Sequence, residues 1–84
     1  MSMQTSQMVL EEVMRAAIAA ARRAAAQAAS GDRHAAGQVF AYHDVLSVLK
    51  EQADLAGVQF DDEVVAGFDP DELIRDSAPL RQAA

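Results

Sequence analysis

The chain has 84 residues, a net charge of −6 at neutral pH and no cysteine. A chain of this length forms at most one domain (1–84) with a thin core that a partner subunit often completes. Without thiols it has neither disulfides nor thiolate metal sites, and its acidity disfavours direct nucleic-acid binding. No apolar run reaches the ~20 residues that span a bilayer, so we expect a soluble cytoplasmic protein with no role at membranes.

Charge is distributed unevenly along the chain. Residues 1–50 hold five basic and four acidic groups, whereas residues 51–84 hold two basic and nine acidic groups. The C-terminal part is therefore a distinct acidic segment. Six of the seven basic residues are arginine and alanine is abundant, a usage that suggests a bacterial gene of high GC content.

A first long helix is predicted over about 6–29. Thr5 or Ser6 can cap its N-terminus, and Glu11 can pair with Arg15 one turn later. The alanine-rich stretch that follows has the highest intrinsic helix propensity of any composition. Residues 1–5 are expected to fray.

A second long helix is predicted over about 33–56. The preceding "SGDRH" offers Gly31 for a left-handed helix end and Asp32 for the next N-cap. Two long helices joined by so short a turn lie antiparallel. Positions equally distant from the turn then face each other, and large residues mostly oppose small ones, as close packing requires. The facing pairs are Ala28 with Ala35, Ala24 with Val39, Ala21 with Tyr42, Ala17 with Leu46, Met14 with Leu49 and Leu10 with Ala53.

Several large apolar residues lie outside the seam that these facing pairs form between the two helices. Either the C-terminal part or a second chain must cover them, because a soluble protein rarely leaves such a patch bare. We expect a homodimer that forms a four-helix bundle. The residues outside the seam are Val9, Val13, Ile18, Phe40, Val45, Val48 and Leu55, of which Phe40, Val45, Val48 and Leu55 are the predicted association surface.

The C-terminal part repeats a short pattern, "FDDEVV" at 60–65 and "FDPDELI" at 68–74. The first copy predicts a single turn at 62–66 and the second a helix over about 70–76. In the second copy Asp69 is the expected N-cap, Pro70 takes the first helical position, and Glu72 completes a capping box. Phe68 and Leu73 occupy the positions of a hydrophobic staple. Residues 77–84 are expected to fray.

The stretch "AYHDVLS" places a tyrosine, a histidine, an aspartate and a serine close together. On a helix, sequence neighbours point about 100° apart, so His43 and Asp44 do not form a base with its orienting partner. Ser47 lies one turn from His43, yet a thin hairpin offers no evident oxyanion hole or pocket. A shared pocket at a dimer interface, with His43 or Tyr42 converging across it, is the enzymatic alternative. We expect no enzyme and no cofactor.

Two clusters of charge remain. The acidic face consists of N-caps and first-turn acids, without the loop glycine of an EF-hand, so we expect no metal. The basic cluster near the turn could hold a phosphate, or receive the acidic C-terminal part. Helix-turn-helix DNA binding is disfavoured because the second helix is acidic. The acidic face comprises Asp61, Asp62, Glu63, Asp69, Asp71 and Glu72, and the basic cluster comprises Arg22, Arg23 and Arg33.

The leading functional hypothesis is a small all-α, non-enzymatic interaction or regulatory module that binds another protein through an apolar helix face. The alternative is an acidic inhibitor that imitates nucleic-acid charge and blocks a nucleic-acid-binding protein.

Overall fold

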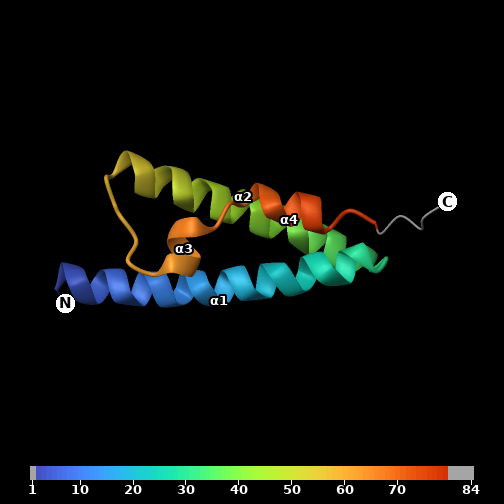
Figure 1. Cartoon of the computed structure of the whole chain (residues 1–84), viewed down its shortest axis with the longest axis horizontal. Coiled ribbons are helices and arrows are strands. Elements are labelled where there is room, and N and C mark those ends of the chain that lie inside the picture. The colour runs from blue at the N-terminus through green and yellow to red at the C-terminus, as the bar shows by residue number, and fades with distance from the viewer. Residues whose placement is uncertain (1, 80–84) are drawn as a thin grey trace.

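The computed structural model of the chain describes residues 2–79 and is all-helical over that range. Two long helices, α1 (Met3–Ala29) and α2 (Arg33–Leu55), pack together as an antiparallel hairpin. Two short helices follow, α3 (Glu63–Gly67) and α4 (Asp71–Asp76). Figure 1 shows them folded back onto the hairpin, so that the molecule is elongated, 54 × 19 × 19 Å.

Helix α1 begins three residues earlier than the sequence suggested. Ser2 is its N-cap, and its hydroxyl oxygen accepts a hydrogen bond from the Thr5 backbone N–H at 3.1 Å. Thr5 and Ser6 therefore lie inside the helix rather than at its cap. Serine at this position satisfies a backbone donor that has no partner within the helix.

The turn between the long helices follows the prediction. Gly31 has a φ of 103°, in the left-handed region that glycine adopts without a Cβ clash. The Asp32 carboxylate accepts from the Ala35 N–H at 3.0 Å and caps α2. Helix α2 ends at Leu55, one residue before the predicted boundary, and Gly57 follows it with a φ of 72°.

The seam of the hairpin is filled as the alternation of large and small residues predicted, except at its open end. Leu10 is 37 % exposed, because α1 and α2 diverge with distance from the turn (Figure 1). Of the predicted pair at this end, Ala53 is therefore buried while Leu10 is not. The seam residues that are buried are Met14, Ala21, Ala24, Ala28, Ala35, Val39, Leu46 and Ala53, while Ala17, Tyr42 and Leu49 are partly buried against them.

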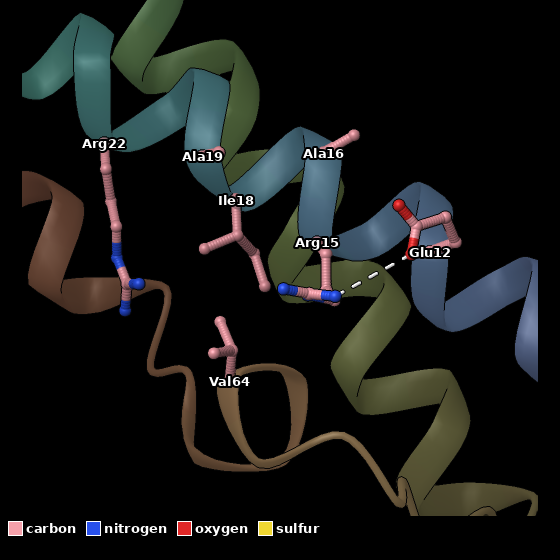
Figure 2. A pocket seen from close by; sticks show the side chains of 7 residues that line it. All are labelled: Glu12, Arg15, Ala16, Ile18, Ala19, Arg22 and Val64. Carbon is pink, nitrogen blue, oxygen red and sulfur yellow. Dashed lines mark ion pairs between the residues drawn. The ribbon is translucent and has the colours of Figure 1, made fainter.

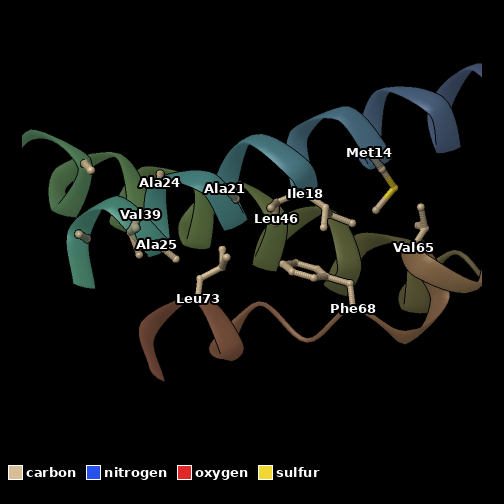
Figure 3. Packing of buried hydrophobic residues seen from close by; sticks show 12 residues of the cluster. Met14, Ile18, Ala21, Ala24, Ala25, Val39, Leu46, Val65, Phe68 and Leu73 are labelled. Carbon is tan, nitrogen blue, oxygen red and sulfur yellow. The ribbon is translucent and has the colours of Figure 1, made fainter. Parts of the chain in front are cut away.

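The C-terminal segment covers one side of the hairpin. Val65, Phe68 and Leu73 are fully or almost fully buried, and Figure 3 shows them pointing toward α1 and α2. Ile18, which the sequence pattern placed outside the seam, is only 1 % exposed because this segment packs over it. The core therefore has three layers of side chains along part of its length, rather than a single seam.

Helix α4 starts within one residue of its predicted position, but without the capping box. The Asp69 carboxylate accepts from the Asp71 N–H at 2.9 Å. The Glu72 side chain does not reach back to Asp69; it binds Arg22 on α1 instead, at 2.8 Å. A tertiary ion pair has displaced the local contact.

In the part of the chain that the structure describes, none of the helices has the length and hydrophobicity needed to cross a bilayer.

Candidate functional site

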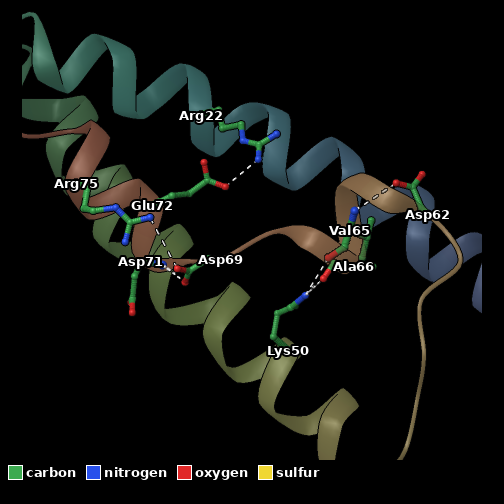
Figure 4. Close-up of polar contacts among 9 residues, drawn as sticks. All are labelled: Arg22, Lys50, Asp62, Val65, Ala66, Asp69, Asp71, Glu72 and Arg75. Atoms are coloured by element: carbon green, nitrogen blue, oxygen red, sulfur yellow. Dashed lines mark hydrogen bonds and ion pairs between the residues drawn. The ribbon is translucent and has the colours of Figure 1, made fainter.

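Four of the six residues of the acidic face bind groups within the chain, while Asp61 and Glu63 are exposed. Glu72 pairs with Arg22, whose guanidinium also lies 5.4 Å from the centre of the Phe68 ring. Asp62 caps α3 by accepting from two backbone N–H groups, and its second oxygen lies 3.2 Å from Nε of Arg15. These contacts fasten the C-terminal segment to α1; Figure 4 shows the pair of Arg22 with Glu72. The basic cluster receives the acidic C-terminal part at Arg22, one of the two outcomes the sequence left open.

A buried glutamate adds to this fastening. Glu11 is only 7 % exposed and accepts from the Asp62 N–H at 2.6 Å and from the Gln7 side chain at 3.1 Å. Gln7 also donates to the Gln59 carbonyl at 2.9 Å. The predicted Glu11–Arg15 pair is not formed, because the buried N–H of Asp62 needs an acceptor. Arg15 pairs with Glu12 and Asp62 instead.

Lys50 is a positioning residue that sequence reasoning missed. Its ammonium donates to the carbonyls of Val65 at 2.9 Å and Ala66 at 3.1 Å, at the C-terminal end of α3 (Figure 4). A cation is stabilised there because the last carbonyls of a helix lack partners and carry partial negative charge. The ammonium also lies 5.7 Å from the centre of the Phe60 ring.

His43 is paired with an aspartate of α4. Its Nε2 lies 2.8 Å from Oδ1 of Asp71 on α4, and no hydrogen bond joins it to Ser47 within residues 2–79. The hydrogen bond to Asp71 raises the pKa of His43 above its ordinary value of 6.5; burial partly opposes this effect and the nearby Asp44 adds to it. His43 therefore links α2 to α4.

This pair gives a pH dependence with a defined sign. Because the folded-state pKa of His43 is raised, its contribution to stability is complete below the unfolded value and is lost as pH rises through the folded value. We expect the free energy of unfolding to fall as the pH rises above the ordinary histidine value of 6.5 and through the folded-state pKa of His43. NMR titration should show the His43 pKa falling in Asp71→Asn, and the same variant should flatten the pH profile. An unchanged His43 pKa in that variant would contradict the assignment.

The groove between α1 and α3 has polar walls but no free ligand group. It has a volume of about 310 Å³ and is lined by Glu12, Arg15, Ala16, Ile18, Ala19, Arg22 and Val64 (Figure 2). Glu12 is paired with Arg15. Both arginines are already paired with carboxylates. In the described range no buried polar side-chain atom lacks a partner, and no three metal-ligating side chains come together. Arg23 and Arg33 are exposed and join no ion pair there.

The opposite side of the hairpin is apolar and uncovered. Val45 follows His43 by two residues and therefore points about 160° away from it. Val45 and Val48 are 64 % and 58 % exposed, and Val9 and Val13 on α1 are similarly bare. We define the uncovered face by the residues that share this side of the two long helices: Val9, Val13, Ala16 and Ala20 of α1, and Gln38, Ala41, Val45, Val48 and Gln52 of α2.

Three features make the uncovered face suitable for docking. Its α2 residues repeat at alternating spacings of three and four, which is the pattern of a second helix-packing seam. It contains no acidic or basic residue, although 24 % of the chain is charged. A shallow groove of about 340 Å³, lined mostly by apolar atoms, runs along it between Ala17, Tyr42 and Val45.

The predicted association surface is exposed throughout, but its four residues do not lie in one line. Val45 and Val48 are central to the uncovered face. Phe40 is 62 % exposed but lies about 140° around α2 from Val45, so it lies outside the uncovered face. Leu55, 76 % exposed, lies at the open end. Helical spacing alone would have separated Phe40 from the valines.

Comparison with known proteins finds no matching family model, no matching curated protein and no matching solved structure.

Proposed function

We propose that this protein is a non-enzymatic interaction module that docks onto helices of another polypeptide chain through the uncovered face. The observation that carries the proposal is the apolar, charge-free face opposite the C-terminal segment. Ion pairs, caps and buried apolar groups elsewhere already have partners within the chain. Exposed contiguous apolar surface of this kind marks interaction sites.

The energetics favour helix docking at this face. Full burial of one valine side chain contributes about 1.5–3 kcal/mol, and the face presents four valines that are more than half exposed. No charge has to be desolvated, so the usual penalty for burying an ion does not arise. Small residues on α1 allow a partner helix to approach closely.

The alternative, an acidic inhibitor that imitates nucleic-acid charge, has weaker support. Four of the six acidic-face residues, Asp62, Asp69, Asp71 and Glu72, bind groups within the chain, and only the other two, Asp61 and Glu63, are exposed without an ion pair among the described residues. A mimic needs carboxylates that are free to meet a basic groove. Binding that weakened steeply with salt would nevertheless favour the mimic, because an apolar contact responds little to ionic strength.

A synthetic amphipathic helix with leucine at every heptad a and d position tests the proposed function. Labelled with a fluorophore, it should bind the protein, as measured by anisotropy. Val48→Asp should weaken this binding at least tenfold, because it places a charge in the apolar contact. Val64→Asp is the matched control: it makes the same substitution on α3, outside the uncovered face, and should leave binding unchanged. Equal binding by both variants would contradict the proposal.

A further inference from the structure

We infer that the occupant of the uncovered face is a second copy of this chain, stacked on the first about a two-fold axis perpendicular to the long helices. The inference rests on the proposed function, since it names the partner of the same face.

Charge is the first reason. Each chain carries a net charge of −6, so two copies repel unless their acidic parts are held apart. The acidic residues of the C-terminal segment lie on the opposite side of the hairpin, and the molecule is 19 Å across. The width of the hairpin, which lies between these acidic residues and the uncovered face, exceeds the Debye length of about 8 Å at physiological salt. The uncovered face is therefore the side through which two acidic chains approach with the least repulsion.

The residue pattern on α2 is the second reason. If two α2 helices cross antiparallel about the midpoint between Leu46 and Ser47, residues equally distant from that midpoint meet. Val45 then meets Val48 of the second copy, and Ala41 meets Gln52. Every α2 residue of the uncovered face from Ala41 to Gln52 thus finds a partner in the same face, as an isologous interface requires.

The pattern on α1 follows the same axis. The point on α1 level with that midpoint lies between Ala16 and Ala17, by the register of the hairpin. Val13 then meets Ala20 of the second copy. Large residues oppose small ones, which fills an interface without voids.

The shape of the hairpin favours this axis over one parallel to the helices. The long helices converge at the turn and diverge at the other end (Figure 1). A perpendicular axis lays the narrow end of one copy on the wide end of the other. A two-fold axis parallel to the helices would instead stack α1 of one copy on α2 of the other. Val9 and Val13 would then meet Val48 and the end of α2 of the second copy, and near the turn alanines would face alanines.

The contact is small. The residues of the uncovered face extend for about 21 Å along α2 and about 17 Å along α1. A contact of this length across two helices buries roughly 1,000 Å² in total, the lower limit for a specific interface. We therefore expect a dissociation constant in the micromolar range, on the order of 1–100 µM.

Single cysteines test the arrangement, because the chain has none of its own. One variant carries Ala41→Cys and another Gln52→Cys; both sites are exposed. The two are mixed, left to exchange subunits and treated with a short bis-maleimide linker. We expect at least tenfold more cross-linked dimer in the mixture than in either variant alone. In the proposed dimer position 41 of one copy lies opposite position 52 of the other, whereas two identical sites lie about 16 Å apart along the α2 helix axis.

Two results would overturn the arrangement. The first is cross-linking in the single-variant samples equal to that in the mixture. The second is no cross-linking in any sample, although each thiol reacts with a monofunctional maleimide. If the amphipathic helix still binds in a Val48-dependent way, the second copy fails as the occupant while the proposed function stands.

Discussion

Leu46→Asp is expected to abolish the helical fold. Leu46 is 2 % exposed and belongs to the central cluster, on the side of α2 that faces α1. Removing a buried leucine side chain costs about 2–5 kcal/mol, and a buried unpaired carboxylate costs more. A domain of this size has a total stability of only about 4–13 kcal/mol. The substitution therefore removes most or all of the stability.

Circular dichroism with thermal melting measures this result. Leu46→Asp should lose its helical signal at room temperature, and Leu46→Ala should melt at a lower temperature than the natural chain. Leu55→Asp is the control, since it makes the same change on the same helix at a residue that is 76 % exposed. Native helicity and an unchanged melt in Leu46→Asp would mean that the hairpin does not pack through this residue.

The hairpin was predictable because its determinants are local. An alanine-rich composition favours helix. Gly31 ends the first helix and Asp32 caps the N-terminus of the second, so the two residues together define the turn. Once the turn is placed, antiparallel packing and the burial of Leu46 follow from residue spacing alone. The divergence of the helices at Leu10 could not be read from spacing, because the C-terminal segment that occupies the open end acts from far along the chain.

The sequence left open whether the C-terminal part or a second chain covers the hairpin, and the contacts by which the C-terminal segment docks were not predictable for a related reason. Helices α3 and α4 have five and six residues, too few for a clear amphipathic period. Their positions depend on contacts between residues some 50 apart, such as Arg22 with Glu72 and Glu11 with the Asp62 N–H. From local spacing, Glu11 was expected to pair with Arg15 and Glu72 to complete a capping box. Both bind residues distant in sequence instead, because those contacts satisfy buried or partly buried groups.

Residue pattern did reveal part of the candidate site. The valines of α2 stand out because they remain after the first seam is assigned. Which apolar residues stay bare depends on where the C-terminal segment lies: it buries Ile18 and leaves Val13 exposed. The roles of Lys50 and His43 likewise require knowing that α3 and α4 lie beside α2.

Val48→Asp is expected to convert a dimer into a monomer without loss of helix. The side chain is 58 % exposed in the single chain, so a carboxylate there remains hydrated and the fold is kept. In the proposed dimer the two-fold axis repeats each contact, and one substitution introduces two carboxylates beside Val45 of the opposite copy. We expect the dissociation constant to rise at least about a hundredfold, equivalent to about 2.7 kcal/mol.

Val64→Asp controls for charge, because it also lowers the net charge by one while lying on α3 at the opposite side of the molecule. An acidic residue in the first turn of α3 is compatible with the helix dipole. This variant should associate like the natural chain. Equal weakening by both substitutions would assign the effect to net charge rather than to the uncovered face.

The most direct measurement is the mass in solution by light scattering or sedimentation, over about 1–500 µM chain and at low and high salt. The natural chain should pass from monomer to dimer with rising concentration, with no weakening at high salt, and Val48→Asp should remain monomeric. A natural chain that stays monomeric throughout, or a dimer that Val48→Asp leaves intact, would contradict self-association through the uncovered face.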